Sequence, residues 1–72
     1  MQDDIQVVVG RRIARLRKAK GFSQDQFAEF AGLDRAHLHR IETGKQQSMT
    51  VKTLKLIADA LEVRVTRILR GY

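Results

Sequence analysis

The sequence predicts an all-α fold in which residues 1–72 form one compact domain of five short helices. The chain contains no proline, and its apolar residues recur mostly at intervals of three and four, the period of a helix with one buried face. Glycines and residues that favour helix starts separate these stretches. Because the chain has no cysteine, packed helices must hold it together without disulfides or thiolate metal sites.

The first helix is expected at about residues 4–19, and Gly21 ends it. One face carries apolar residues at helical spacing, Ile5, Val9, Ile13 and Leu16, and the predicted core face consists of Val9, Ile13 and Leu16. The opposite face carries a basic stripe of Arg11, Arg15 and Lys18. We expect this stripe to face solvent and to add only long-range attraction for an anion.

Three local signals predict a second helix at residues 23–31. Ser23 is a favourable N-cap, and Gln26 stands three residues later, where its side chain can bond back to the cap. Phe22 and Phe27 have the spacing of a hydrophobic staple. The helix is expected to end at Ala31, because Gly32 can supply a left-handed turn.

The third helix is expected at residues 34–43, with Asp34 as its cap and Gly44 after its end. Leu38 and Ile41 point into the core at 100° per residue. The second and third helices are therefore short and joined by about three or four residues, which is the spacing of a helix-turn-helix unit.

Two further helices are expected, at residues 50–61 and 65–70. Thr50 caps the fourth helix, whose inward stripe is Leu54, Ile57, Ala58 and Leu61. The fifth helix ends at Gly71. Two interpretations of the C-terminal segment stay open: its apolar residues complete the monomer core, or some of them form a dimer interface. The interface residues would be Val65, Ile68, Leu69 and Tyr72.

Two stretches, SQDQFAEFAGLDRAHLHRIETGK and TVKTLKLIADALEV, resemble the lambda-repressor-like (Xre-type) helix-turn-helix family, and the likeness extends over about residues 9–69. The agreeing positions are Ser23, Gln24, Phe27, Ala28, Gly32, Leu38, Ile41, Glu42, Gly44, Leu54, Ala58 and Leu61. The chain looks closest to stand-alone phage repressors and restriction-modification controller proteins. The departures are Phe30 at a usually polar position, Glu62 in place of a frequent glycine, Arg64 at a capping position and a loop 45–49 without proline.

The resemblance implies a DNA-binding domain whose third helix enters the major groove. It also implies that Gln24 lies at the DNA backbone and that Arg17 pairs with Glu42, which ties the first helix to the third. Such a buried or half-buried ion pair would fix the orientation of the helix more than it would add stability.

With its apolar residues turned inward, the third helix presents four candidates for base contact: Arg35, Ala36, His39 and Arg40. The planar fork of Arg35 matches the two major-groove acceptors of guanine. Arg40 could do the same one turn later or settle on a phosphate, and Ala36 is small enough to touch a thymine methyl. The alternative is that this surface is only a solvated helix face.

Contacts with the DNA backbone are expected on both sides of the third helix. Ser23 and Gln24 stand at a helix start, which attracts anions. Residues leaving the other end are Thr43, Lys45, Gln46 and Gln47. For His37, a packed or phosphate-facing role is as plausible as base contact. His37 and His39 are two residues apart and point in different directions, so no metal site is expected.

A formal net charge of +6 favours a polyanionic partner. Two short helices position few base contacts, so the sequence predicts a homodimer on pseudo-palindromic double-stranded DNA. Nothing indicates an enzyme, a cofactor or a membrane span, and a soluble cytoplasmic protein is expected. The alternative function is an antitoxin-like or adaptor protein that binds another protein, an alternative favoured by Phe30 if that residue is exposed.

Overall fold

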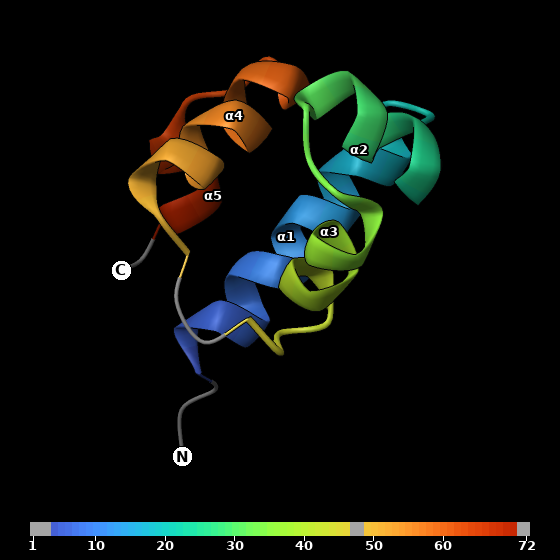
Figure 1. The fold of residues 1–72 in the computed structure, drawn as a ribbon. Coiled ribbons are helices and arrows are strands. Elements are labelled where there is room, and N and C mark those ends of the chain that lie inside the picture. The colour runs from blue at the N-terminus through green and yellow to red at the C-terminus, as the bar shows by residue number, and fades with distance from the viewer. Residues whose placement is uncertain (1–3, 47–48, 71–72) are drawn as a thin grey trace.

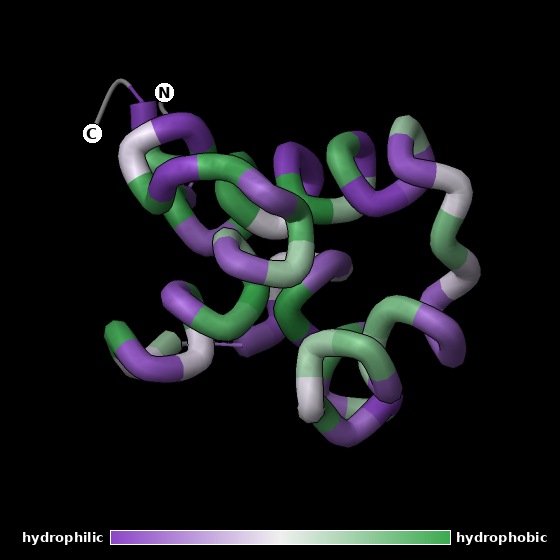
Figure 2. Tube along the Cα trace, turned by 90° about the horizontal axis from the view of Figure 1, so that it is seen from above, coloured by the Kyte–Doolittle hydropathy of each residue, from purple (hydrophilic) through white to green (hydrophobic). Residues whose placement is uncertain are grey.

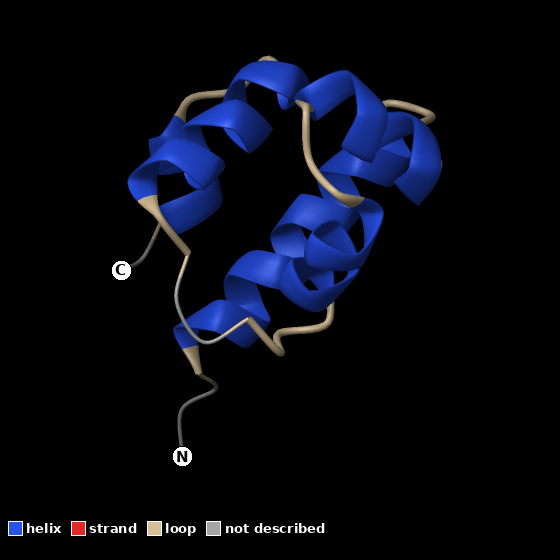
Figure 3. Ribbon diagram, viewed as in Figure 1, coloured by secondary structure: helices blue, strands red, loops and turns tan. Residues whose placement is uncertain are grey.

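The computed structural model describes residues 4–46 and 49–70, and in these ranges it contains helices and no strand. The helices are α1 (Ile5–Ala19), α2 (Gln24–Ala31), α3 (Arg35–Glu42), α4 (Val51–Leu61) and α5 (Val65–Leu69) (Figure 1). The predicted all-α, five-helix fold is confirmed, and each predicted helix matches an observed one within one residue at either end. Short connections join them (Figure 3).

The long helix α1 is the centre of the packing. It lies against α3, α4 and α5, while α2 packs between α3 and α4. Figure 1 shows α2 and α3 on one side of the molecule and α4 and α5 on the other. No helix in the described part of the chain has the length and apolar character needed to cross a bilayer.

The core is made of apolar side chains from all five helices. The largest fully buried members are Phe27, Ile13, Leu38, Ile41, Ile57, Leu61 and Ile68. Hydrophobic and hydrophilic segments follow one another along the helical turns in Figure 2, as burial of one helix face requires. Ile5, on the same face of α1 by its spacing, is 45% exposed. The first turn of α1 lies at the end of the domain beside the N-terminus, so the buried face of α1 begins at Val9.

The predicted helix starts are confirmed where a side chain bonds to the local backbone. Ser23 Oγ accepts a hydrogen bond from the Gln26 amide at 3.1 Å, and Gln26 Oε1 accepts one from the Ser23 amide at 2.9 Å. Thr50 Oγ1 likewise accepts from the Thr53 amide at 3.1 Å. Asp34 occupies the cap position of α3, but its exposed carboxylate makes no capping bond, so that expected cap is wrong in its chemistry.

A glycine inside α1 allows this helix to approach α3 closely. Gly10 is buried, and a Cβ at this position would overlap the carbonyl oxygen of Ile41 and lie 3.0 Å from that of Glu42. A glycine in a helix interior is unfavourable by roughly 0.5–1 kcal/mol relative to alanine. Gly10 therefore has a packing reason: it brings the backbone of α1 against the carboxyl end of α3.

The turn between α2 and α3 depends on Gly32. Its φ of 77° and ψ of 31° are left-handed, and its amide donates to Glu29 O at 3.2 Å. This conformation has little steric cost for glycine. The turn sets the direction in which α3 leaves α2, as the helix-turn-helix spacing predicts.

The C-terminal helix is anchored to α1. Ile68 is fully buried, so its assignment to a dimer interface is wrong; it is the member of the apolar group that packs inward on the monomer core. Arg12 Nη1 donates to the carbonyl oxygens of Ile68 at 3.0 Å and Arg70 at 2.6 Å, and so satisfies acceptors at the end of α5. The predicted end at Gly71 lies outside the described residues.

Candidate nucleic-acid interface

The outer face of α3 gathers the four predicted base contacts. Arg35, Ala36, His39 and Arg40 are all exposed and line one shallow surface hollow. On the inner face, Leu38 is fully buried and Ile41 nearly so. The helix therefore presents a polar surface with two guanidinium groups, while its apolar side packs in the core. His37 is half-buried, at the boundary between the two faces.

Arg35 has a partner that sequence reasoning missed. Its Nε lies 2.6 Å from Asp25 Oδ1, and the two side chains are 65% and 74% exposed. Asp25 stands in the first turn of α2, while Arg35 is the first residue of α3. Because these residues are on different helices, only the angle between α2 and α3 brings them together.

The other arginine of the outer face contacts the loop that follows α3. Arg40 Nε lies 3.4 Å from Gln46 Oε1, and the Gln46 amide donates to the Arg40 carbonyl at 3.2 Å. Arg40, a predicted base contact, and Gln46, a predicted contact with the DNA backbone, are thus neighbours. Lys45 beside them is exposed, and Gln47, which was also predicted to contact the backbone, lies outside the described residues.

The hydroxyl of Thr43 is committed to its own helix. It donates to His39 O at 2.8 Å, and it also lies 3.3 Å from Arg40 O. Phosphate oxygens only accept hydrogen bonds, so this hydroxyl would have to leave His39 O before it could hold DNA. This geometry weakens the prediction that Thr43 contacts the backbone.

At the start of α2, Ser23 is the predicted cap, whereas the Gln24 side chain has a partner that was not predicted. Ser23 Oγ is the cap acceptor, which leaves its hydroxyl proton as a donor. Gln24 is half-buried, and its Nε2 donates to Glu42 Oε1 at 2.9 Å. The Gln24 side chain thus contacts Glu42, the residue that pairs with Arg17. The backbone amides in the first turn of α2 remain the natural anion donors of this helix.

The ion pair that the resemblance implies is present between α1 and α3. Arg17 Nε donates to Glu42 Oε2 at 2.6 Å, and Nη2 donates to Oε1 at 3.0 Å, so the contact is bidentate. The side chains are only 7% and 4% exposed. Arg17 Nη1 also donates to the Phe22 carbonyl at 2.8 Å. Among the described residues, no buried side-chain polar atom lacks a partner.

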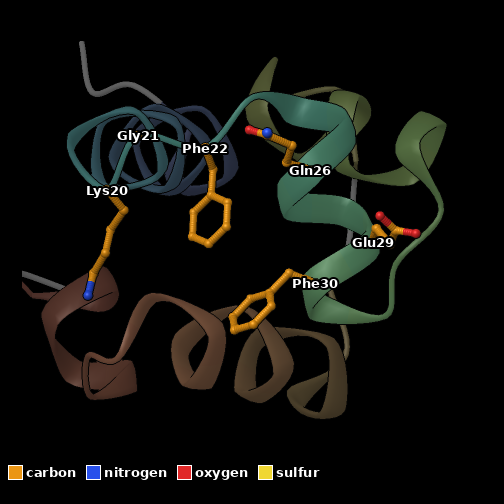
Figure 4. A pocket seen from close by; sticks show the side chains of 6 residues that line it. All are labelled: Lys20, Gly21, Phe22, Gln26, Glu29 and Phe30. Atoms are coloured by element: carbon orange, nitrogen blue, oxygen red, sulfur yellow. The ribbon is translucent and has the colours of Figure 1, made fainter.

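A separate hollow lies at the junction of α1 and α2. Its lining includes Phe30, which is 65% exposed and stacks on Phe22 at a centroid distance of 5.4 Å. The full lining is Lys20, Gly21, Phe22, Gln26, Glu29 and Phe30 (Figure 4). Both phenyl rings project into the same space (Figure 4). This aromatic surface is separate from the outer face of α3.

Lys20 also forms an ion pair with Glu62 at the end of α4. Lys20 Nζ lies 2.5 Å from Glu62 Oε1, and the carboxylate side chain is 77% exposed. The hydrogen bond from Lys20 and its positive charge hold the pKa of Glu62 below its ordinary value. Glu62 has a φ of 60°, and no other non-glycine residue in the described ranges has a positive φ.

The remaining candidates for a dimer interface are partly covered. Val65 and Leu69 are half-buried and pack against the core, and Tyr72 lies outside the described residues. The neighbouring surface hollow is lined by Glu62, Val63, Arg64, Thr66, Arg67 and Arg70. Within residues 4–46 and 49–70, no cluster of three or more histidine, aspartate or glutamate side chains is arranged to hold a metal ion.

Comparisons with known proteins agree with the five-helix fold. The Helix-turn-helix (HTH_3) family model matches residues 13–68. The HTH-type transcriptional regulator SlrR of Bacillus subtilis (strain 168) is 36% identical over 61 residues, which cover 85% of this chain and 40% of SlrR. The matched part of this chain therefore spans less than half the length of that relative.

Two solved structures are similar in both fold and sequence. The restriction-modification controller protein C.AhdI from Aeromonas hydrophila has a TM-score of 0.82 and 32% identity, with 88% of this chain and 94% of that one covered. The N-terminal DNA binding domain of SinR from Bacillus subtilis has a TM-score of 0.83 and 33% identity, with 89% and 93% covered.

Proposed function

Because this chain belongs to the Helix-turn-helix (HTH_3) family, we propose that it is a transcriptional regulator that binds double-stranded DNA sequence-specifically in the cytoplasm. The observation that carries the proposal is the outer face of α3, where Arg35, Ala36, His39 and Arg40 are exposed together. The comparisons support it, since the similar SinR domain is a DNA binding domain and C.AhdI is a controller protein.

In the proposed complex, α3 lies in the major groove with its first turn nearest the base edges. Arg35 is the main reader, because its terminal nitrogens match the two acceptors of guanine. Ala36 allows close approach, and His39 and Arg40 reach bases or phosphates one turn later. The rigid attachment of the inner face of α3, through Leu38, Ile41 and the buried Arg17–Glu42 pair, supports this role by holding the helix in one orientation.

Contacts with phosphates are proposed on both sides of α3. On one side, the proposed contacts come from Ser23, from the main-chain amide of Gln24 and from the half-buried His37. On the other side, they come from Lys45 and Gln46, and Thr43 and Gln47 are weaker candidates. The net charge of +6 adds long-range attraction. The exposed basic stripe of α1 belongs to this general field and contacts no base.

We propose that the protein works as a homodimer. One α3 reads too few base pairs for strong specificity, and two-fold symmetry doubles the number. Val65, Leu69 and Tyr72 are the proposed interface residues. The expected operator is a pseudo-palindrome with recognition-helix centres about 34 Å apart, or a multiple of that spacing.

Selection of bound fragments from random duplex DNA tests this function. The expected outcome is a two-fold symmetric sequence that the protein binds more tightly than scrambled duplex, together with sedimentation of a dimer on that DNA. Equal binding to both duplexes would contradict sequence-specific recognition. A monomer at tens of micromolar that stays monomeric on the selected DNA would contradict the dimer.

A second function, binding of another protein in the manner of an antitoxin or adaptor, is favoured by one observation. Phe30 exposes 65% of its surface and stacks on Phe22 beside a hollow, and large exposed aromatic residues are common at protein interfaces. A gel shift with unlabelled selected duplex as competitor separates the two functions. An interaction module without DNA specificity would show no preference between selected and scrambled competitor.

A further inference from the structure

The ion pair between Asp25 and Arg35 joins the first turns of α2 and α3. Arg35 Nε lies 2.6 Å from Asp25 Oδ1 although both side chains are mostly exposed, at 65% and 74%. An isolated surface pair of this kind contributes little to stability. Its position is unusual, however, because Arg35 is also the leading candidate for base contact. The pair therefore bears on how the arginine meets DNA.

The contact uses only one part of the guanidinium. Arginine has five N–H donors in a planar fork, and Asp25 faces the Nε side. The terminal nitrogens Nη1 and Nη2 remain to meet O6 and N7 of a guanine end-on. The carboxylate attracts the guanidinium through its charge, and because it has no hydrogen to donate it does not compete for the acceptors of the base.

Preorganisation gives such a contact an energetic consequence. An arginine that is free in solution loses rotamer entropy when DNA immobilises it. An arginine whose range of positions is already narrowed by the charge of Asp25 loses less. The gain applies to the one base pair that matches the favoured position, so it raises preference at that base pair.

The charge of Asp25 has the opposite effect on DNA in general. It stands in the first turn of α2, close to the helix start where a phosphate is proposed to bind. A carboxylate there repels phosphates of every sequence. Asp25 should thus lower non-specific affinity while it raises preference for one base pair, a combination that neither a structural residue nor a simple surface charge would produce.

We propose that Asp25 is a positioning residue that sets the specificity of Arg35 for guanine and weakens binding to other DNA. The proposal rests on the proposed DNA-reading function. It assigns α2 a part in base selection although no α2 side chain needs to touch a base.

The test compares Asp25→Ala with Asp59→Ala. Asp59 is a matched control, because its carboxylate forms an exposed pair with Lys55 within α4, also at 2.6 Å, and the substitution removes the same charge. Dissociation constants are measured for three duplexes: the site selected by the wild-type protein, the same site with the base pair that Arg35 reads replaced, and a scrambled duplex. That base pair is the one at which Arg35→Ala loses preference. Melting curves show that each variant is folded.

For Asp25→Ala we expect tighter binding to scrambled duplex and a fall of about two- to tenfold in preference at the single base pair, the range expected from freeing one long side chain. Asp25→Asn removes the charge and keeps the size of the side chain, so it should lose the preference as Asp25→Ala does. Asp59→Ala should leave the preference unchanged.

Two results would overturn the proposal. An equal gain in affinity on all three duplexes, with preference intact, would make Asp25 only a repulsive charge. A rise in preference would mean that Asp25 competes with the guanine for Arg35. If the wild-type protein itself shows no preference for its selected site, the proposed function fails first, and this result is distinct from both others.

Discussion

Two arginine–carboxylate pairs join α3 to the rest of the molecule, one at each end, and their shortest N–O distances are equal at 2.6 Å. At the carboxyl end, Glu42 pairs with Arg17 of α1, and the side chains are 4% and 7% exposed. At the amino end, Arg35 pairs with Asp25 of α2, and the side chains are 65% and 74% exposed. The pairs share this shortest distance, but they differ in burial, and hydrogen bonds accompany the buried pair.

This difference teaches that distance alone does not assign a role to an ion pair. In the buried pair, both charges have lost most of their water, so breaking it leaves a buried charge without its counter-ion. In the exposed pair, water and salt compete with the contact, and DNA can reach both partners. The buried end therefore fixes where α3 lies, and the exposed end is available to take part in the proposed reading of DNA.

Replacing Glu42 by alanine should produce the largest loss of stability. It leaves the guanidinium of Arg17 buried and without its carboxylate, which costs about 3–5 kcal/mol. Urea unfolding measures the loss. The matched variant at the other end is Asp25→Ala, which breaks an exposed pair of equal length and should change stability by less than about 1 kcal/mol. Similar losses from both variants would remove the distinction between the two ends.

Replacing Gly10 by alanine should also loosen the buried end, by about 1–3 kcal/mol. The new methyl group would overlap the Ile41 carbonyl, and overpacking in a close helix contact has costs of this size. The sign of the change in unfolding free energy is diagnostic, because a glycine-to-alanine substitution at an unobstructed helix position stabilises a protein by roughly 0.4–1 kcal/mol. Thermal or urea unfolding that shows a more stable variant would mean that α1 and α3 are not held this closely.

Much of the fold was predictable because its signals are local. The Ser23–Gln26 capping box, the Gly32 turn and the buried Leu38 and Ile41 each follow from residues close together in the chain. Features that depend on helix angles were not predictable in this way. The glycine inside α1 was a usable signal for a close approach, yet its partner in α3 is about thirty residues away.

The candidate site shows the same division. The outward direction of Arg35 follows from helical periodicity, whereas its pairing with Asp25 requires the angle between α2 and α3. Spacing placed Ile68 in a group of apolar residues but did not predict which of them packs inward. In the structure, Ile68 is the residue that is fully buried. The bonds from Arg12 to the end of α5 join residues 56 and 58 positions apart, which no local pattern indicates.

The smallest expected effect on stability concerns Glu62, which forms a third exposed or buried ion pair of this domain with Lys20. Because the folded-state pKa of Glu62 is lowered from 4.5, the pair stabilises the protein above that pH, and the contribution disappears as pH falls through the folded-state value. Glu62→Gln should be slightly less stable than wild type at neutral pH and equal to it at strongly acid pH. Thermal melts across this range measure both.

Glu62→Gly separates backbone strain from charge at the same position. Glycine adopts the left-handed conformation at φ 60° without the clash that a Cβ produces. We therefore expect the glycine variant to melt at a higher temperature than the glutamine variant. The reverse order would show that the backbone at the end of α4 is not strained.

The most direct test of the central claim, that α3 reads DNA while its flanks hold it, compares Arg35→Ala with Lys45→Ala. Binding is measured on the selected site and on scrambled duplex over a range of salt. Arg35→Ala should cost about 1–3 kcal/mol on the selected site and relax preference mainly at one base pair in each half-site. Lys45→Ala should weaken binding to both duplexes alike and lower the magnitude of the salt slope by about one per subunit. Equal weakening of both duplexes by Arg35→Ala, with a change of base preference in Lys45→Ala, would contradict this account.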